Sequence, residues 1–227
     1  MRMHRLIHLQ FVGLWEKSIS SSKIYCDYNA TSPLSNSVID YLKSGDFVFA
    51  NPSSFHSQGK SSRKTLRETR DFLFETFNLS EDSFRLFFQS GATEGINTLI
   101  IGAAEKAWQE NRKICLFYSP IDHSCVVNIL NRFCSYGHDT KPLPINENGD
   151  LLVEEAISLI NSVDEVNSED KIIHFTFVNN ETGVVWPLAI AEKVKNETQA
   201  KIICDGVQAP GKTPGWNELS DDIDAYS

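Results

Sequence analysis

The residues of this chain that are best suited to chemistry lie in four short segments. The first comprises residues 90–95, SGATEG, between an apolar run typical of a strand and a longer run typical of a helix. Free N–H groups and the positive end of the helix dipole attract a phosphate at such a place, and the Thr93 hydroxyl adds a donor. The alternative is that Thr93 only caps the helix.

His123 stands in the second segment, residues 119–124, SPIDHS, directly after the strand-like run 113–118. An imidazole there lies at the carboxyl end of a strand, where ligands of open α/β sheets collect, and its flat ring can stack on a pyridine. The alternative is an ordinary solvated loop histidine.

The third and fourth segments each close an apolar run. Asn180 lies in residues 178–183, VNNETG, where an amide can donate to a phenolic oxygen or merely form a turn with Gly183. Asp205 ends the run KIICD, and Gln208 follows three residues later. An aspartate at the end of a buried strand can keep a pyridine nitrogen protonated, or it can simply cap the next turn.

Together the four segments resemble the class V aminotransferase family of fold-type I enzymes that use pyridoxal 5'-phosphate (PLP), and most closely its cysteine desulfurases. The resemblance extends to residues 24–33, IYCDYNATSP, and 51–59, NPSSFHSQG. It covers the chain from about Ile24 to Ser227 and leaves the first 22 residues or so outside.

The resemblance implies a role for each matching position. The residues implied to contact the cofactor are Ala92, Thr93, His123, Asn180, Asp205 and Gln208. The first two would hold the phosphate, and the two amides would bond the phenolic oxygen. His123 would stack on the ring and assist proton transfer, and Asp205 would pair with the pyridine nitrogen, so these two are the implied catalytic residues. The implied substrate-pocket residues are Asn29, Ala30 and Thr31.

In the family a short Ser-Gly-His-Lys-like stretch follows the positions equivalent to residues 224–227, and its lysine binds the cofactor covalently. The sequence here stops at Ser227, before that stretch and before the family's sulfur-accepting cysteine. We therefore expect the N-terminal portion of a cysteine desulfurase, inactive by itself, whose family converts L-cysteine to L-alanine with transfer of sulfur to an enzyme cysteine. The alternatives are a selenocysteine lyase, an aminotransferase, or a truncated remnant without catalysis.

Composition favours a folded domain, with 41% hydrophobic and 22% charged residues among 227. A net charge of −9 argues against nucleic-acid binding, and without an apolar stretch of 18 residues we expect no membrane span. The five cysteines lack a CxxC pairing, which predicts free thiols, no metal and a cytoplasmic location. Cys125, two residues after His123, is the thiol we expect to be reactive, because a cationic neighbour would lower its pKa. The resemblance also implies a homodimer and a sulfur-acceptor protein as partners.

The pattern predicts the α/β fold of type I PLP enzymes: a mixed, mostly parallel sheet with helices on both faces, incomplete at the C-terminus. We expect an N-terminal extension over residues 1–22, part of a small domain with an active-site loop over 23–60, and the large PLP-binding domain over 61–227. The expected strands are 85–89, 113–118, 140–143, 171–178, 201–205 and 223–227. The expected helices are 35–44, 61–77, 94–110, 124–136, 153–162 and 188–198.

Overall fold

The computed structural model describes residues 24–220 and 222–227, which belong to two compact units that divide after Ser44. The N-terminal extension predicted for residues 1–22 lies outside the described residues. In the first unit, a turn at residues 28–30 precedes helix α2 (Asn36–Ser44). The second unit holds all the strands, so the fold of the predicted PLP-binding domain is decided there.

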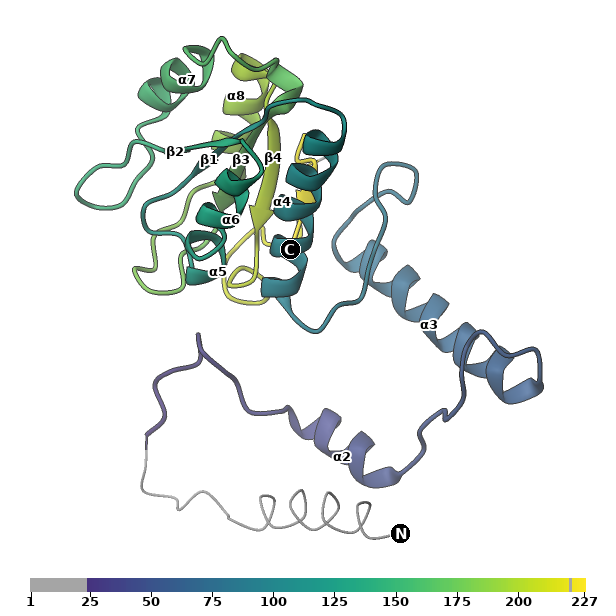
Figure 1. The fold of residues 1–227 in the computed structure, drawn as a ribbon. Coiled ribbons are helices and arrows are strands. Elements are labelled where there is room, and N and C mark those ends of the chain that lie inside the picture. The colour runs from purple at the N-terminus through teal and green to yellow at the C-terminus, as the bar shows by residue number, and fades with distance from the viewer. Residues whose placement is uncertain (1–23, 221) are drawn as a thin grey trace, which may run out of the picture. The chain divides into compact units, whose positions relative to one another are not determined.

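Five parallel strands form the sheet of the second unit (Figure 1). Their order across the sheet is β2-β1-β3-β4-β5. The strands are β1 (Cys115–Tyr118), β2 (Asp139–Pro142), β3 (Lys171–Thr176), β4 (Lys201–Asp205) and β5 (Ala225–Tyr226). β3 is buried along its whole length, as expected for a central parallel strand that is covered on both faces.

Helices cover both faces of this sheet. The helices of the second unit are α3 (Ser57–Thr76), α4 (Ala92–Gln109), α5 (Ser124–Val127), α6 (Leu130–Ser135), α7 (Val153–Asn161) and α8 (Leu188–Thr198). One apolar core joins α4, α5 and α6 to one face, and a second core joins α7 and α8 to the other (Figure 1). The predicted α/β architecture, a parallel sheet with helices on both faces, is thereby confirmed.

Alternation along the strands decides which side chains face which core. Ile172 on β3 and Ile203 on β4 pack in the core of α4, α5 and α6, whereas Ile173 and Phe175 pack in the opposite core. Since successive side chains of a strand point to opposite faces, His174, Thr176 and Asp205 lie on the α4 side.

Two predicted elements were wrong in detail. Residues 85–89, predicted as a strand, form none, because no strand of the described chain pairs with them and a strand needs a hydrogen-bonded neighbour. The predicted helix over residues 124–136 is divided into α5 and α6 at Asn128 and Ile129. Two valines followed by an asparagine have low helix propensity, which weakens the helix at this point.

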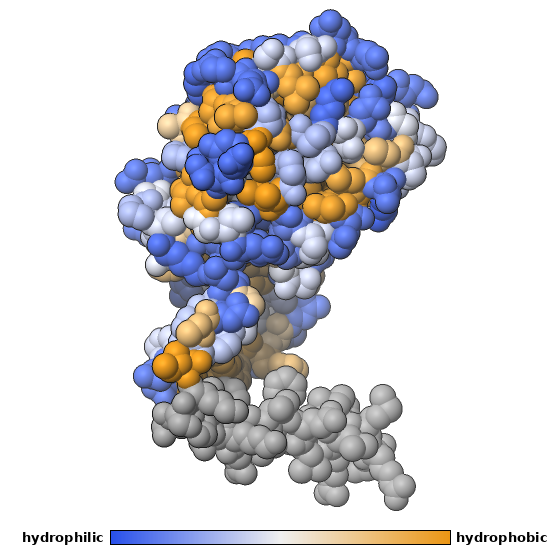
Figure 2. Space-filling model, turned by 90° about the vertical axis from the view of Figure 1, so that its left-hand side faces the viewer, coloured by the Kyte–Doolittle hydropathy of each residue, from blue (hydrophilic) through white to orange (hydrophobic). Residues whose placement is uncertain are grey.

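Figure 2 shows the side of the second unit on which α7 lies in Figure 1. Hydrophobic and hydrophilic residues are intermixed on this surface. Among the described residues, the helices are all too short or too polar to cross a membrane. The described residues also contain no group of three or more His, Cys, Asp or Glu side chains that could hold a metal ion.

Candidate functional site

Several of the predicted cofactor residues lie at the carboxyl ends of the strands, beside the point where the strand order reverses. From β1 the chain continues to β2 on one side, whereas β3 lies on the other side of β1 and leads to β4 and β5. Open α/β sheets bind ligands at the carboxyl ends of strands beside such a switch point. The loop after β1 carries His123, the loop after β3 carries Asn180, and β4 ends in Asp205.

The predicted phosphate turn opens helix α4. The helix begins at Ala92 with Gly91 as its N-cap, so Thr93 is already helical and its interpretation as the cap was wrong. The N–H groups of Glu94 and Gly95 donate to the Gly91 carbonyl at 3.1 and 3.2 Å. Within the described part of the chain, the N–H groups of Ala92 and Thr93 are left at the open end of the helix, where they can bind an anion.

Ser227 joins this helix start to the end of β4. Its hydroxyl donates to the Ala92 carbonyl at 3.4 Å, and its own carbonyl accepts from the Gly206 N–H at 2.9 Å. The predicted phosphate turn and Asp205, which precedes Gly206, therefore border one region at the carboxyl edge of the sheet.

His123 is exposed, but its ring is held in place. Its Nδ1 accepts from the backbone N–H of Cys125 at 3.2 Å and thereby caps α5. An acceptor Nδ1 requires the neutral ring to carry its proton on Nε2. The ring is thus oriented with a donor at the end that faces away from α5.

Asp205 is buried, with 9% of its surface exposed. Its Oδ1 accepts from the Val207 N–H at 3.0 Å, the one hydrogen bond that reaches this carboxylate from the described residues. Burial raises the pKa of Asp205, and the negative charge of Asp122 raises it further. The hydrogen bond from the Val207 N–H and the charge of His174 act to lower this pKa, but they do not outweigh burial. A buried carboxylate with a spare oxygen fits a protonated pyridine nitrogen, because the added cation would offset the cost of burying the anion.

The two predicted amides lie at the same edge of the sheet. Asn180 and Gln208 are both half-buried, and Gln208 accepts a hydrogen bond from the Lys212 ammonium group. Their side chains are of the kind that can donate to a phenolic oxygen.

Asn179, next to Asn180, has an anchoring role that the sequence did not indicate. Its Nδ2 donates to the Ile121 carbonyl at 2.7 Å, and its Oδ1 accepts from the N–H groups of Glu181 and Thr182 at 3.0 and 2.9 Å. The loops that carry Asn180 and His123 are thereby joined. Adjacent asparagines at a strand end look alike in a sequence, so no signal could have separated the two roles.

A buried histidine, His174, was also missed. Its Nδ1 lies 2.9 Å from Oδ2 of Asp122, the residue before His123, and both side chains are fully buried. In the sequence His174 is one polar residue inside an apolar run, and a strand pattern alone cannot show what it meets.

Comparison with known proteins assigns the chain to a family. Residues 24–220 match the family model "Aminotransferase class-V". The chain belongs to the class V aminotransferase family.

Similar class V proteins include "Putative cysteine desulfurase IscS 1" of Bacillus subtilis, 31% identical over 85% of this chain and 48% of that protein. "Cysteine desulfurase NifS" of Azotobacter vinelandii is 28% identical over 84% of this chain and 45% of its own length. The solved structure "SspA in complex with cysteine" aligns with a TM-score of 0.70 and 26% identity, over 82% of this chain and 51% of that one. The chain thus spans about half the length of these relatives and corresponds to their N-terminal portion.

The predicted substrate residues of this class V chain lie in the first unit. Asn29, Ala30 and Thr31 are exposed, and the N–H groups of Ala30 and Thr31 point to the Asp27 carbonyl at 3.3 and 3.4 Å. Their role in substrate binding stays a prediction.

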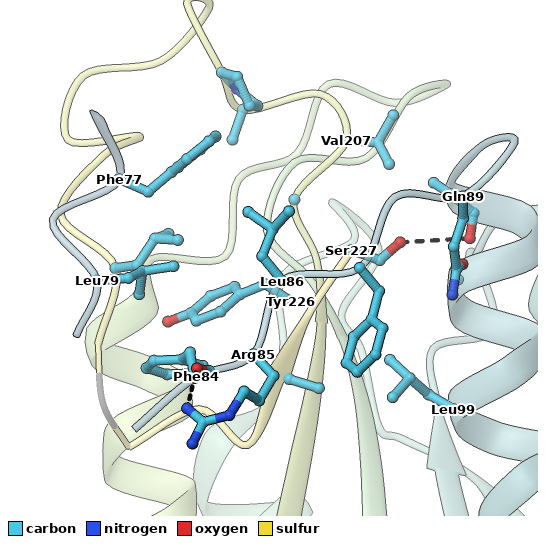
Figure 3. A pocket seen from close by; sticks show the side chains of 18 of the residues that line it. Phe77, Leu79, Phe84, Arg85, Leu86, Gln89, Leu99, Val207, Tyr226 and Ser227 are labelled. Atoms are coloured by element: carbon cyan, nitrogen blue, oxygen red, sulfur yellow. Dashed lines mark hydrogen bonds between the residues drawn. The ribbon is translucent and has the colours of Figure 1, made fainter. Parts of the chain in front are cut away.

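A cavity of about 750 Å³ adjoins the predicted phosphate turn (Figure 3). Apolar side chains from residues 84–88, α4 and β5 point into it, among them Phe84, Leu86, Leu99 and Tyr226. Of the predicted cofactor residues, Ala92 lines this cavity and the other five do not. The cavity therefore borders the predicted cofactor residues without enclosing them.

The expectation of a lowered pKa for Cys125 was wrong. The thiol is buried in the core of α4, α5 and α6, and burial raises its pKa to about 11, with Asp205 and Asp122 acting in the same direction. Hydrogen bonds from the backbone at Cys125 and from the Thr93 side chain act to lower this pKa, but burial outweighs them. All five cysteines of the chain are free thiols.

Proposed function

We propose that the carboxyl edge of this sheet binds PLP, and the observation that carries the proposal is the placement of Asp205. This buried carboxylate ends β4 and reaches the open first turn of α4 through Gly206 and Ser227. A buried carboxylate at one end and free N–H groups at the other suit a ligand that has a protonated pyridine and a phosphate. Enzymes of the class V aminotransferase family depend on PLP.

Each residue has a distinct task in this proposal. Ala92 and Thr93 hold the phosphate by their N–H groups, and Asp205 holds the ring nitrogen in its protonated form. Bound there, PLP supplies an electron sink for negative charge that develops on the substrate. His123, whose ring is fixed by the hydrogen bond from the Cys125 N–H, would cover one face of the pyridine ring and would hold a proton on Nε2 for transfer. Asn180 and Gln208 hold the phenolic oxygen.

For the protein that carries this chain, we propose cysteine desulfurase activity on L-cysteine. The proposal is supported by relatives named cysteine desulfurase and by the similar solved structure of SspA in complex with cysteine. A homodimer, a sulfur-acceptor protein and a cytoplasmic location belong to the same proposal. The similar proteins also include a mitochondrial one, of Candida maltosa, so the compartment needs its own measurement.

Titration of the chain with PLP, followed by absorbance and fluorescence, tests the binding site. Asp205→Asn removes the charge that pairs with the pyridine nitrogen, so we expect the Kd to rise by about tenfold to a hundredfold. The matched control is Glu181→Gln, which neutralises an exposed carboxylate in the loop after β3 and should leave the Kd unchanged. Equal affinity of the wild type and Asp205→Asn would refute the site.

The reaction is tested with the product of the complete reading frame, incubated with L-cysteine and PLP. We expect sulfide and L-alanine in equal amounts when a reducing agent is present. Activity on L-selenocysteine alone would favour a selenocysteine lyase, and transfer of the amino group to a keto acid would favour an aminotransferase. Absence of all three reactions would favour a non-catalytic remnant.

A further inference from the structure

The buried pair Asp122 and His174 lies directly beneath the proposed PLP site. The Asp122 carboxylate accepts three hydrogen bonds: from His174 at 2.9 Å, from the Thr176 hydroxyl at 2.6 Å and from the Ser119 N–H at 2.9 Å. Both oxygens of the carboxyl group are thereby hydrogen-bonded, Oδ1 to Thr176 and Oδ2 to His174 and Ser119. The side chains of Asp122 and His174 have no exposed surface, so the anion is held without water.

The second nitrogen of the His174 ring has no partner. Nε2 is buried, and it accepts or donates no hydrogen bond within the described residues. Buried polar atoms are rarely left in this state, and each unmatched atom calls for an explanation.

The strand register places His174 beside Asp205. Thr176 lies opposite Asp205 and His174 opposite Ile203 on the neighbouring strand, so His174 and Asp205 are diagonal neighbours on one face of the sheet. The charges of Asp122 and Asp205 both act on His174, and its charge acts on Asp205. His123, in the loop after β1, also acts on Asp205, and the charges of Asp205 and Asp122 act in turn on the Cys125 thiol of α5.

The charges of this cluster decide the protonation of His174. A neutral imidazole would leave two carboxylates buried close together without a buried positive charge beside them. Burial acts to lower the pKa of His174, but the charge of Asp122, its hydrogen bond and the charge of Asp205 outweigh burial and raise it. With an imidazolium the cluster carries one net negative charge, which one protonated pyridine would neutralise.

We propose that His174 is a positioning residue for the cofactor: as an imidazolium held by Asp122, it keeps Asp205 ionised and ready to pair with a pyridinium nitrogen. This inference rests on the proposed binding of PLP. His174 does not touch the ligand in this arrangement, but acts through the charge and orientation of Asp205.

The charge of His174 is measurable without PLP. In the wild-type chain labelled with nitrogen-15, the ring nitrogens of His174 should both carry protons at about pH 7, and in Asp122→Asn the ring should be neutral. A neutral His174 in the wild type would overturn the inference, whether or not PLP binds. The wild-type measurement, which decides this outcome, needs no variant to fold.

A ligand pair tests whether the charge acts through the pyridine nitrogen. For His174→Gln, which keeps a donor toward Asp122 but loses the charge, we expect the Kd of PLP to rise about tenfold. The Kd of the carbocyclic analogue, which has a C–H in place of the ring nitrogen, should stay within about twofold of the wild type. The matched control is His138→Gln, because His138 is also buried but bonds the Ala104 carbonyl and the Ile114 N–H, at the amino end of β1.

The outcomes separate the two proposals. Equal loss for both ligands in His174→Gln would mean a general structural role, and no loss for either would mean no role; each overturns the inference while PLP binding stands. A wild-type chain that binds neither ligand overturns the proposed site and the inference with it. Asp122→Asn combined with His174→Gln should weaken PLP binding no more than His174→Gln does, because the two residues act as one unit.

Discussion

The side-chain amide of Asn179 donates to the carbonyl of Ile121 across 2.7 Å and so joins the loop after β3 to the loop after β1. These two loops carry Asn180 and His123, which come from segments more than 50 residues apart in the sequence. The geometry of the proposed PLP site therefore depends on a residue that need not touch the ligand.

Replacement of this amide should destabilise the fold. In Asn179→Ala the Ile121 carbonyl and the N–H groups of Glu181 and Thr182 lose their partner, so we expect the free energy of unfolding to fall by about 2–4 kcal/mol. Urea unfolding measures this difference. Asn148→Ala serves as the control, since Asn148 is exposed and its side chain makes none of these bonds. Equal midpoints for the two variants would contradict the anchoring role.

Two substitutions of His123 should separate its capping role from its role toward the ligand. Asparagine is a good N-cap, so His123→Asn should keep the start of α5 and lose only the ring, whereas His123→Ala loses both. We expect both variants to weaken PLP binding to a similar extent. Only His123→Ala should also lose about 1 kcal/mol of stability, measured by thermal melting. An unchanged PLP affinity in His123→Asn would show that the ring does not contact the ligand.

The thiol of Cys125 should react slowly with alkylating agents. With a pKa of about 11, its thiolate is about one part in a thousand at pH 8, and the fraction grows as the pH rises toward that value. The exposed Cys26 and Cys134 should therefore be alkylated first by iodoacetamide, as followed by peptide mass spectrometry. In denaturant all five should react alike. Alkylation of Cys125 before Cys26 in the folded chain would show that the Cys125 thiol is accessible to solvent and would contradict this prediction.

A polypeptide of residues 1–227 should bind PLP without a stoichiometric covalent bond. Lys212 is the described lysine that contacts a predicted cofactor residue, through Gln208, but its ammonium group is held in that hydrogen bond. Borohydride reduction and mass spectrometry should then show no single modified lysine, and L-cysteine should yield no sulfide above a protein-free control. One stoichiometric pyridoxyl group, lost in Lys212→Arg, would identify Lys212 as a covalent site and contradict this prediction.

The sequence alone was enough to predict the alternation of strands and helices, because apolar periodicity is a local property that burial of one face imposes. The bounds of α8 and β4 agree with the prediction to the residue, and those of α2, α7 and β2 to one residue at either end. The candidate residues Asp205, His123 and Asn180 were likewise visible, since polar residues directly after apolar runs must lie at strand ends. The short motifs around them also indicated the family.

Tertiary structure decided what depends on contacts between distant segments. The apolar residues 84–88 have the pattern of a strand, but a strand exists only where a neighbour accepts its hydrogen bonds, and none of the described strands does so. Cys125 follows a histidine, yet its pKa is set by the core into which α5 folds. The pairing of His174 with Asp122 joins residues 52 positions apart, and only the parallel register of β3 and β4 places that pair beside Asp205. Electrostatic and packing energies depend on distances through space, which a local sequence pattern does not contain.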